Sequence, residues 1–82
     1  MDACELVRRF GNRVRMLRRS RDVTQAQLAE AIERSTEFVS RIERGIASPS
    51  FPTVAAIAEA LSVEPKDLFD FSALPASTRK GR

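Results

Sequence analysis

The stretch Thr24–Gly45, TQAQLAEAIERSTEFVSRIERG, decides the fold of this chain because it contains two short helical patterns in succession. In the first, a cap residue precedes apolar residues at the spacing of one helix face: Thr24, then Leu28, Ala29 and Ile32. In the second, the same order returns: Ser35, then Val39 and Ile42. The sequence therefore predicts two capped helices packed across a tight corner.

The second of these helices has two chemically different sides. At about 100° per residue, the polar and long side chains fall together: Thr36, Glu37, Ser40, Arg41 and Arg44. The other side holds Phe38, Val39, Ile42 and Glu43. A helix-turn-helix needs this division, because its second helix packs with one face and reads base edges in a DNA major groove with the other. An ordinary amphipathic surface helix, with Glu37 and Arg41 paired at i, i+4, would give the same pattern.

The pattern TQAQLAEAI followed by S-x-x-x-V-S-R-I-E-R-G-x-x-x-P resembles the phage repressor/Cro-like helix-turn-helix family, and the likeness extends over roughly residues 8–70. The matching positions are Thr24, Gln25, Leu28, Ala29, Ile32, Ser35, Val39, Ser40, Ile42, Glu43, Gly45 and Pro49. The resemblance implies a lambda-repressor-like DNA-binding fold with double-stranded DNA as its partner.

The corner between the two helices departs from this family. The family usually has glycine and then an apolar residue there, whereas this chain has Glu33 and Arg34. Glycine takes a positive φ at low cost. Glu33 must therefore adopt a strained conformation, or the turn must differ and change the angle between the helices.

Helical periodicity elsewhere predicts an all-α, compact five-helix bundle over residues 5–71. The first helix should run from Glu5 to about Arg21, and its apolar stripe consists of Leu6, Phe10, Val14 and Leu17. Pro52 can occupy an early position of a fourth helix, and a short fifth helix starts near Pro65. We expect residues 1–4 to be a flexible lead-in and residues 72–82 to be a disordered basic tail.

The amino-acid composition argues against several classes of function. At 82 residues the chain is one small domain, and it has one cysteine and no His, Trp or Tyr, so common catalytic and metal-binding groups are missing. We therefore expect neither an enzyme nor a metal, a cofactor or a small-molecule ligand. No apolar run is long enough to cross a membrane and no signal-peptide pattern is present, which with Cys4 predicts a cytoplasmic protein.

Charge is unevenly distributed along the chain. Residues 1–21 carry seven arginines and two acids, residues 22–76 carry four basic residues and nine acids, and the last six residues carry three basic ones. Basic ends around an acidic middle favour a polyanion as partner. A charged solubilising surface would give a similar count.

The base-reading residues should be Thr36, Glu37, Ser40 and Arg41, because the start of the second helix enters the groove deepest in the family. Arg41 can donate two hydrogen bonds to guanine, and Glu37 can accept one from the amino group of cytosine. The competing interpretation is that Glu37 only orients Arg41 and contacts no base.

Phosphate contacts should come from residues around this helix: Gln25, Arg44, Ser48, Ser50 and Arg13. Gln25 lies in the first turn of its helix, where backbone N–H groups are free. In the family, the loop after the reading helix runs beside the DNA backbone, so Ser48 and Ser50 could donate to phosphate. Ordinary turn and cap roles explain these two serines equally well.

The resemblance also implies a structural ion pair between Arg18 and Glu43, on the inner side of the reading helix. Both lie at semi-buried angles of their helices. The alternative is that Arg18 is solvated like its neighbour Arg19.

Three phenylalanines, Phe51, Phe69 and Phe71, exceed the needs of so small a core. They either close the bottom of the domain or form an exposed patch that self-associates. We take them as the candidate contacts of a homodimer.

Together these features predict a bacterial or phage-encoded, sequence-specific transcriptional regulator, most simply a repressor on a two-fold-related operator. It would be nucleoid-associated when bound. The alternative is a protein-interaction module, or an antitoxin-type partner-binding protein, whose basic surface is incidental.

Overall fold

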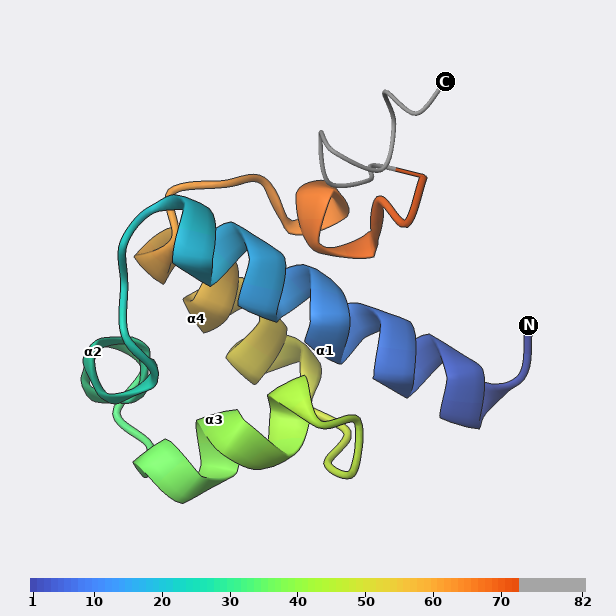
Figure 1. The fold of residues 1–82 in the computed structure, drawn as a ribbon, viewed down its shortest axis with the longest axis horizontal. Helices are drawn as coiled ribbons and strands as arrows, with labels where there is room; N and C mark the ends of the chain where they lie inside the picture. The colour runs from blue at the N-terminus through green and yellow to red at the C-terminus, as the bar shows by residue number, and fades with distance from the viewer. Residues whose placement is uncertain (73–82) are drawn as a thin grey trace.

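The computed structural model describes residues 1–72, which form four α-helices and one 3₁₀ helix (Figure 1). These elements are α1 (Ala3–Ser20), α2 (Gln25–Ala31), α3 (Thr36–Glu43), α4 (Phe51–Ala60) and η1 (Pro65–Phe69). No strand occurs among the described residues, so the prediction of an all-helical fold is confirmed, and α2 and α3 pack across a short corner as a helix-turn-helix requires. The basic tail predicted for residues 72–82 lies, apart from Ser72, outside the described residues.

The prediction of five α-helices is wrong in its last element. η1 is a five-residue 3₁₀ helix, in which the Asp67 N–H donates to the Glu64 carbonyl at 2.9 Å. The Asp67 side chain also accepts from the Glu64 N–H at 3.0 Å, which closes the first turn. So short a segment is typically a 3₁₀ helix, since it closes i to i+3 bonds that need fewer residues than an α-turn.

Each α-helix begins with a side-chain cap. The capping residues are Asp2, Thr24, Ser35 and Ser50. Each oxygen accepts the backbone N–H three residues on, at distances of 2.8, 3.0, 3.0 and 3.4 Å. The caps predicted at Thr24 and Ser35 are confirmed. Asp2 caps α1, so this helix starts at Ala3, two residues before the predicted Glu5.

All four α-helices also end in the same way, with one residue in the left-handed region. These residues are Asp22, Glu33, Gly45 and Ser62, with φ of 56°, 58°, 77° and 58°. The N–H of the next residue then donates to a carbonyl five positions back, which is the Schellman arrangement: Val23 to Arg18, Arg34 to Ala29, Ile46 to Arg41 and Val63 to Ala58. Glu33 therefore keeps the turn typical of the family by adopting the strained conformation.

The core lies between the helices and is made of apolar side chains from α1 to η1. Its buried members are Phe10, Val14, Leu28, Ala29, Ile32, Val39, Ile42, Val54, Ile57, Ala58, Leu61 and Leu68. Leu6 was expected to line this core but is 39% exposed. The reason is geometric, since the N-terminal end of α1 projects beyond the other helices (Figure 1).

Gly11 allows α1 to lie unusually close to α3. A Cβ built on Gly11 would lie 2.1 Å from the carbonyl oxygen of Ile42, which is far inside contact distance. Any larger residue would push α1 away from the C-terminal end of α3. This crossing fixes the distance from which α1 side chains reach Glu43.

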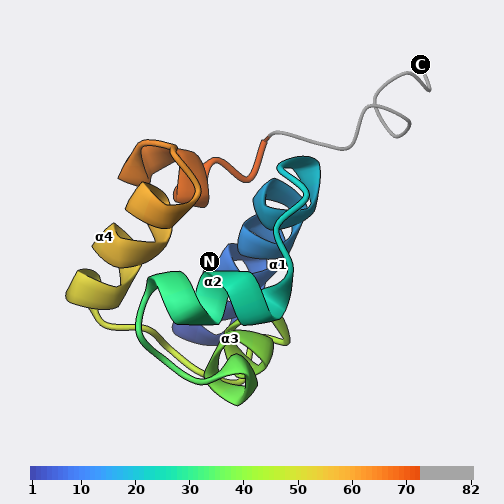
Figure 2. The same cartoon turned by 90° about the vertical axis from the view of Figure 1, so that its left-hand side faces the viewer.

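α3 and η1 lie at opposite edges of the molecule in both views, and α1 lies between them in Figure 1 (Figures 1 and 2). α2 packs directly against α3 (Figure 2). None of the helices in the described part of the chain is long and apolar enough to cross a membrane.

Candidate nucleic-acid interface

The outer face of α3 is polar and open to solvent. Val39, Ile42 and Glu43 are buried on its inner face. Outside lie the predicted base-reading residues together with Arg44: Thr36, Glu37 and Arg41 are exposed like Arg44, and Ser40 is half-buried. The structure therefore brings all five residues to one surface. A helix with this division is anchored by one face and free to contact a ligand with the other.

These outer side chains contact one another in the free protein. Arg41 Nε lies 3.3 Å from Glu37 Oε2, and Arg44 Nη2 lies 3.7 Å from the same oxygen. Arg44 Nε also donates to Ser40 Oγ at 3.2 Å. The i, i+4 pair that competes with base reading is thus present without DNA. Because both partners are exposed, each such pair contributes only about 0–1 kcal/mol and is readily exchanged for contacts with a ligand.

Beneath this face, Arg18 and Glu43 form a buried, two-point ion pair. Arg18 Nε donates to Glu43 Oε2 at 2.6 Å, and Arg18 Nη2 donates to Glu43 Oε1 at 3.0 Å. Arg18 Nη1 donates to the Val23 carbonyl at 2.8 Å. Arg15 Nε lies 3.7 Å from Glu43 Oε1. One guanidinium thus ties the end of α1, the loop before α2 and the inner side of α3 together.

The charge state of this pair follows from its surroundings. Burial alone would raise the pKa of Glu43, but hydrogen bonds from Arg18 and Gln25 and the charges of Arg18 and Arg15 lower it below its ordinary value. The hydrogen bond to Glu43 raises the pKa of Arg18 against the opposing effect of burial. Both groups are therefore charged at neutral pH.

Gln25, predicted to bind phosphate, is half-buried and already has a protein partner. Its Nε2 donates to Glu43 Oε1 at 3.0 Å. This bond connects the first turn of α2 to α3 and holds the Gln25 amide in place. The sequence correctly predicted that Gln25 lies in the first turn of α2. It did not predict the bond to Glu43, because the two residues are far apart in the chain.

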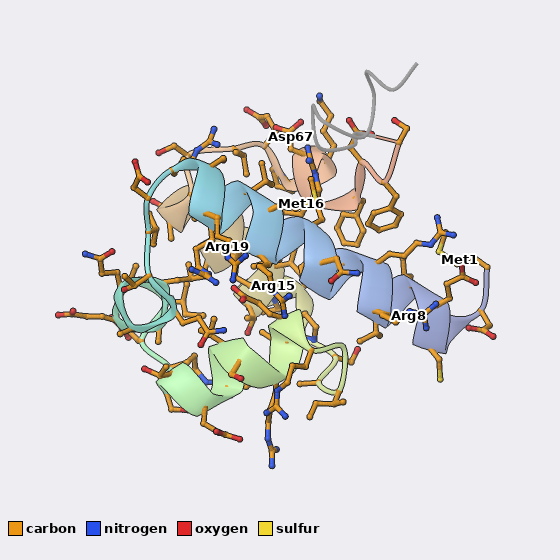
Figure 3. The ribbon with its side chains drawn as sticks, viewed as in Figure 1. Met1, Arg8, Arg15, Met16, Arg19 and Asp67 are labelled. Atoms are coloured by element: carbon orange, nitrogen blue, oxygen red, sulfur yellow. The ribbon has the colours of Figure 1, made fainter. Side chains whose placement is uncertain are left out.

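The other predicted phosphate ligands are not all on this face. Ser48 is exposed in the loop after α3, whereas the Ser50 hydroxyl caps α4 and donates to Thr53 Oγ1 at 3.2 Å. Arg13 points elsewhere, because its Nε donates to the Asp67 carbonyl at 2.8 Å. Asp67 belongs to η1, on the far side of α1 from α3, so the structure does not bring Arg13 to the interface (Figure 3).

Two contacts near the interface were missed by sequence reasoning. Arg34 lies with Cζ 3.7 Å from the centroid of the Phe38 ring, a cation–π contact beside the start of α3. Their i, i+4 spacing was the available signal. Arg15 reaches Glu43 from α1, where it lies between Arg8 and Arg19 along the helix (Figure 3). Its position three residues before Arg18 places it on the same side of α1.

The phenylalanines predicted to mediate dimerisation line a second, apolar surface. Phe51 is 85% exposed, Phe69 is 41% exposed and Phe71 is half-buried. The Phe69 ring centroid lies 5.1 Å from that of Phe10 and 6.3 Å from that of Phe71. A shallow cavity of about 150 Å³ lies here, lined by Leu6, Val7, Phe10, Ser48, Pro49, Phe51, Val54 and Phe69. Phe69 and Phe71 thus cover the bottom of the core, while Phe51 stands in solvent.

Comparisons with known proteins agree with this geometry. A family model described as a helix-turn-helix domain matches residues 9–70. The control protein C.BamHI of Bacillus amyloliquefaciens is 38% identical over 66 residues, which are 79% of this chain and 82% of that protein. The immunity repressor protein of Bacillus phage phi105 is 39% identical over 54 residues, which are 66% of this chain but 38% of that protein.

Among solved structures, the restriction-modification controller protein C.AhdI from Aeromonas hydrophila superposes with a TM-score of 0.80. Its sequence is 32% identical, and the match covers 84% of this chain and all of that one. The clp gene regulator ClgR from Corynebacterium glutamicum gives a TM-score of 0.77 at 30% identity, covering 85% of this chain and 96% of that chain.

Proposed function

This chain belongs to the helix-turn-helix domain family, and from that premise we propose that it binds double-stranded DNA sequence-specifically and regulates transcription, most simply as a repressor. Its relatives include a control protein, an immunity repressor and a restriction-modification controller, none of them named as an enzyme. Bacterial and phage relatives support a bacterial or phage origin and a cytoplasmic location.

One observation carries this proposal. α3 buries its apolar side and Glu43 while exposing polar, hydrogen-bonding side chains along an edge that no other described element covers (Figures 1 and 2). An α-helix so displayed fits a major groove. The ion pair beneath it ties α3 to α1, and a helix positioned before binding costs less to order at the interface.

The roles of the side chains follow from their positions on α3. We assign base reading to Thr36, Glu37, Ser40 and Arg41 and backbone contact to Gln25, Arg44 and Ser48. Binding exchanges the ion pairs of Glu37 with the two arginines for contacts with base edges and phosphates. In this scheme Arg41 donates to guanine and Glu37 accepts from cytosine.

The apolar surface supports a homodimer as the binding species. Phe51 exposes a large apolar ring next to a shallow cavity that a second copy could fill. A two-fold pair would present two copies of α3 to successive major grooves, about 34 Å apart. Such a dimer would recognise an operator with two related half-sites.

Salt dependence of binding to duplex DNA tests this function against the protein-interaction alternative. Contacts with phosphates release counterions, so the binding constant for duplex DNA should fall steeply as salt rises. Failure to bind any duplex at low or high salt would favour the protein-interaction module and overturn the proposal.

A further inference from the structure

The guanidinium of Arg34 is held beside the start of α3 without using its hydrogen-bond donors. Its Cζ lies 3.7 Å from the centroid of the half-buried Phe38 ring. Within residues 1–72, no carboxylate lies within 4.0 Å of this guanidinium, and none of the guanidinium N–H groups has a protein acceptor. The side chain is exposed, so the cation on the Phe38 ring faces solvent with its guanidinium donors available.

The backbone fixes the direction of this side chain. Glu33 takes a φ of 58°, and the Arg34 N–H donates to the Ala29 carbonyl at 2.9 Å. Ser35 then caps α3. Arg34 therefore leaves the chain between two hydrogen-bonded turns, and the Phe38 ring limits its rotamers further. An arginine fixed in this way loses less conformational entropy on binding than a free one.

Arg34 also borders the face assigned to base reading. At about 100° per residue, Phe38 lies about 60° around α3 from Arg41, just outside the outer polar face. A helix seated in a major groove is flanked by phosphates on both sides. The cation on Phe38 stands where one flank would lie, although Glu30 and Glu33 in the same region weaken its attraction for anions.

We propose that Arg34, positioned by Phe38, is a further phosphate-binding residue that contacts the DNA backbone beside the first turn of α3. This inference rests on the proposed DNA-binding function and adds a residue to it. The competing role is purely structural, in which Arg34 only shields the Phe38 ring from water. Contact with a base edge is a third possibility that the test separates.

The test compares duplex binding by the full chain and by Arg34→Gln over a range of salt concentrations. Gln keeps part of the stem over the ring but removes the charge. Loss of one phosphate contact should lower the slope of log K against log salt by about 0.9 and weaken binding about five- to tenfold near 0.1 M salt. Arg34→Lys should keep the slope, because the charge remains.

Lys66→Gln is the matched control. Lys66 is also an exposed cation, but it lies in η1, on the side of the molecule away from α3. Lys66→Gln changes the net charge by the same amount as Arg34→Gln. It should leave the slope of log K against log salt nearly unchanged. Equal effects of Arg34→Gln and Lys66→Gln would overturn the inference, since only general charge would then matter.

Phe38→Leu tests the positioning role. It should weaken binding two- to threefold when Arg34 is present and have no effect in the Arg34→Gln background, because the ring acts through the cation. A purely structural role predicts a lower melting temperature for Arg34→Gln with an unchanged salt slope, which would contradict the inference. A changed base preference of Arg34→Gln would also contradict phosphate binding, because it would show that Arg34 contacts a base.

Failure of the two ideas can be told apart. If the unmodified protein binds no duplex, the proposed function itself falls. If the unmodified protein binds duplex DNA with a steep salt dependence that Arg34→Gln does not alter, only the proposed role of Arg34 is rejected.

Discussion

At the scale of single side chains, the carboxylate of Glu43 joins three elements. It belongs to α3, accepts hydrogen bonds from Arg18 on α1, and accepts another from Gln25 at the start of α2. The reading helix is thus fixed by a charged contact buried directly beneath its exposed face. The sequence predicted the Arg18–Glu43 pair through its resemblance to a known family, and in the structure the two side chains are in contact.

Removing Glu43 should be far more costly than replacing the whole pair. Glu43→Ala leaves the Arg18 cation buried without a partner, and we expect a loss of about 3–5 kcal/mol in the free energy of unfolding. Replacing both residues with methionine should cost much less, because no charge is then stranded. Urea denaturation of the single and double variants checks this, and a Glu43→Ala protein as stable as the unmodified one would contradict it.

The pH dependence of stability should report the same carboxyl. The pKa of Glu43 is lowered in the folded state, so its contribution is complete above the unfolded value of about 4.3 and is lost as pH falls through the folded pKa. We expect the difference in unfolding free energy between the unmodified protein and Glu43→Gln to shrink as pH falls below about 4. A difference that stays constant between pH 7 and pH 3 would show that the Glu43 charge does not stabilise the fold.

At the scale of helices, local signals predicted most starts and ends, but not the backbone conformation in which two of the helices end. Thr24 and Ser35 show their capping role in sequence because their side chains make a local bond. Like the end at Glu33, the ends at Asp22 and Ser62 use the left-handed conformation without glycine, so periodicity located these ends but did not give their backbone conformation. At each of these ends the left-handed residue lets the next N–H bond to a carbonyl five positions back, which satisfies the end of the helix without glycine.

The strained end of α2 makes a direct prediction. Glu33 is exposed and has a φ of 58°, a conformation that costs a residue with a Cβ about 1–2 kcal/mol. Glu33→Gly should therefore raise the free energy of unfolding by about 0.5–1 kcal/mol, after the greater unfolded-state entropy of glycine is subtracted. The matched control is Glu30→Gly inside α2, which should lower stability by about 1 kcal/mol. Equal destabilisation by both changes would show that the turn is not strained.

Long-range contacts explain the other differences between sequence and structure. Arg13 was assigned to phosphate but bonds to the Asp67 carbonyl, because α1 turns that side chain toward η1. Gly11 gave no signal in the sequence, yet its missing Cβ sets the crossing of α1 and α3. Both depend on how distant elements pack, which periodicity along one helix does not specify.

At the scale of the whole molecule, the proposed function assigns DNA recognition to the polar edge along α3 and self-association to the apolar surface around Phe51. Phe51 is 85% exposed, so its ring contributes little to the fold of one chain. We expect Phe51→Glu to fold normally but to weaken self-association, because it places a charge in the proposed contact. Sedimentation of the free protein and of its complex with duplex DNA measures this.

Ile46→Glu is the control for that prediction. Ile46 is 63% exposed and apolar but does not line the cavity, so its replacement should leave the oligomeric state unchanged. An unmodified protein that is monomeric both free and on DNA would rule out the homodimer. Equal weakening by both variants would show that the contact lies elsewhere.

The most direct test of the central claim is a binding selection on random duplexes with the unmodified protein, Arg41→Ala and Gln25→Ala. The unmodified protein should recover a preferred sequence with two-fold-related half-sites. Arg41→Ala should bind it about 1–3 kcal/mol more weakly and lose preference at one position per half-site, while Gln25→Ala should weaken all sequences alike. The account is contradicted if Arg41→Ala lowers affinity uniformly while Gln25→Ala changes the preferred bases.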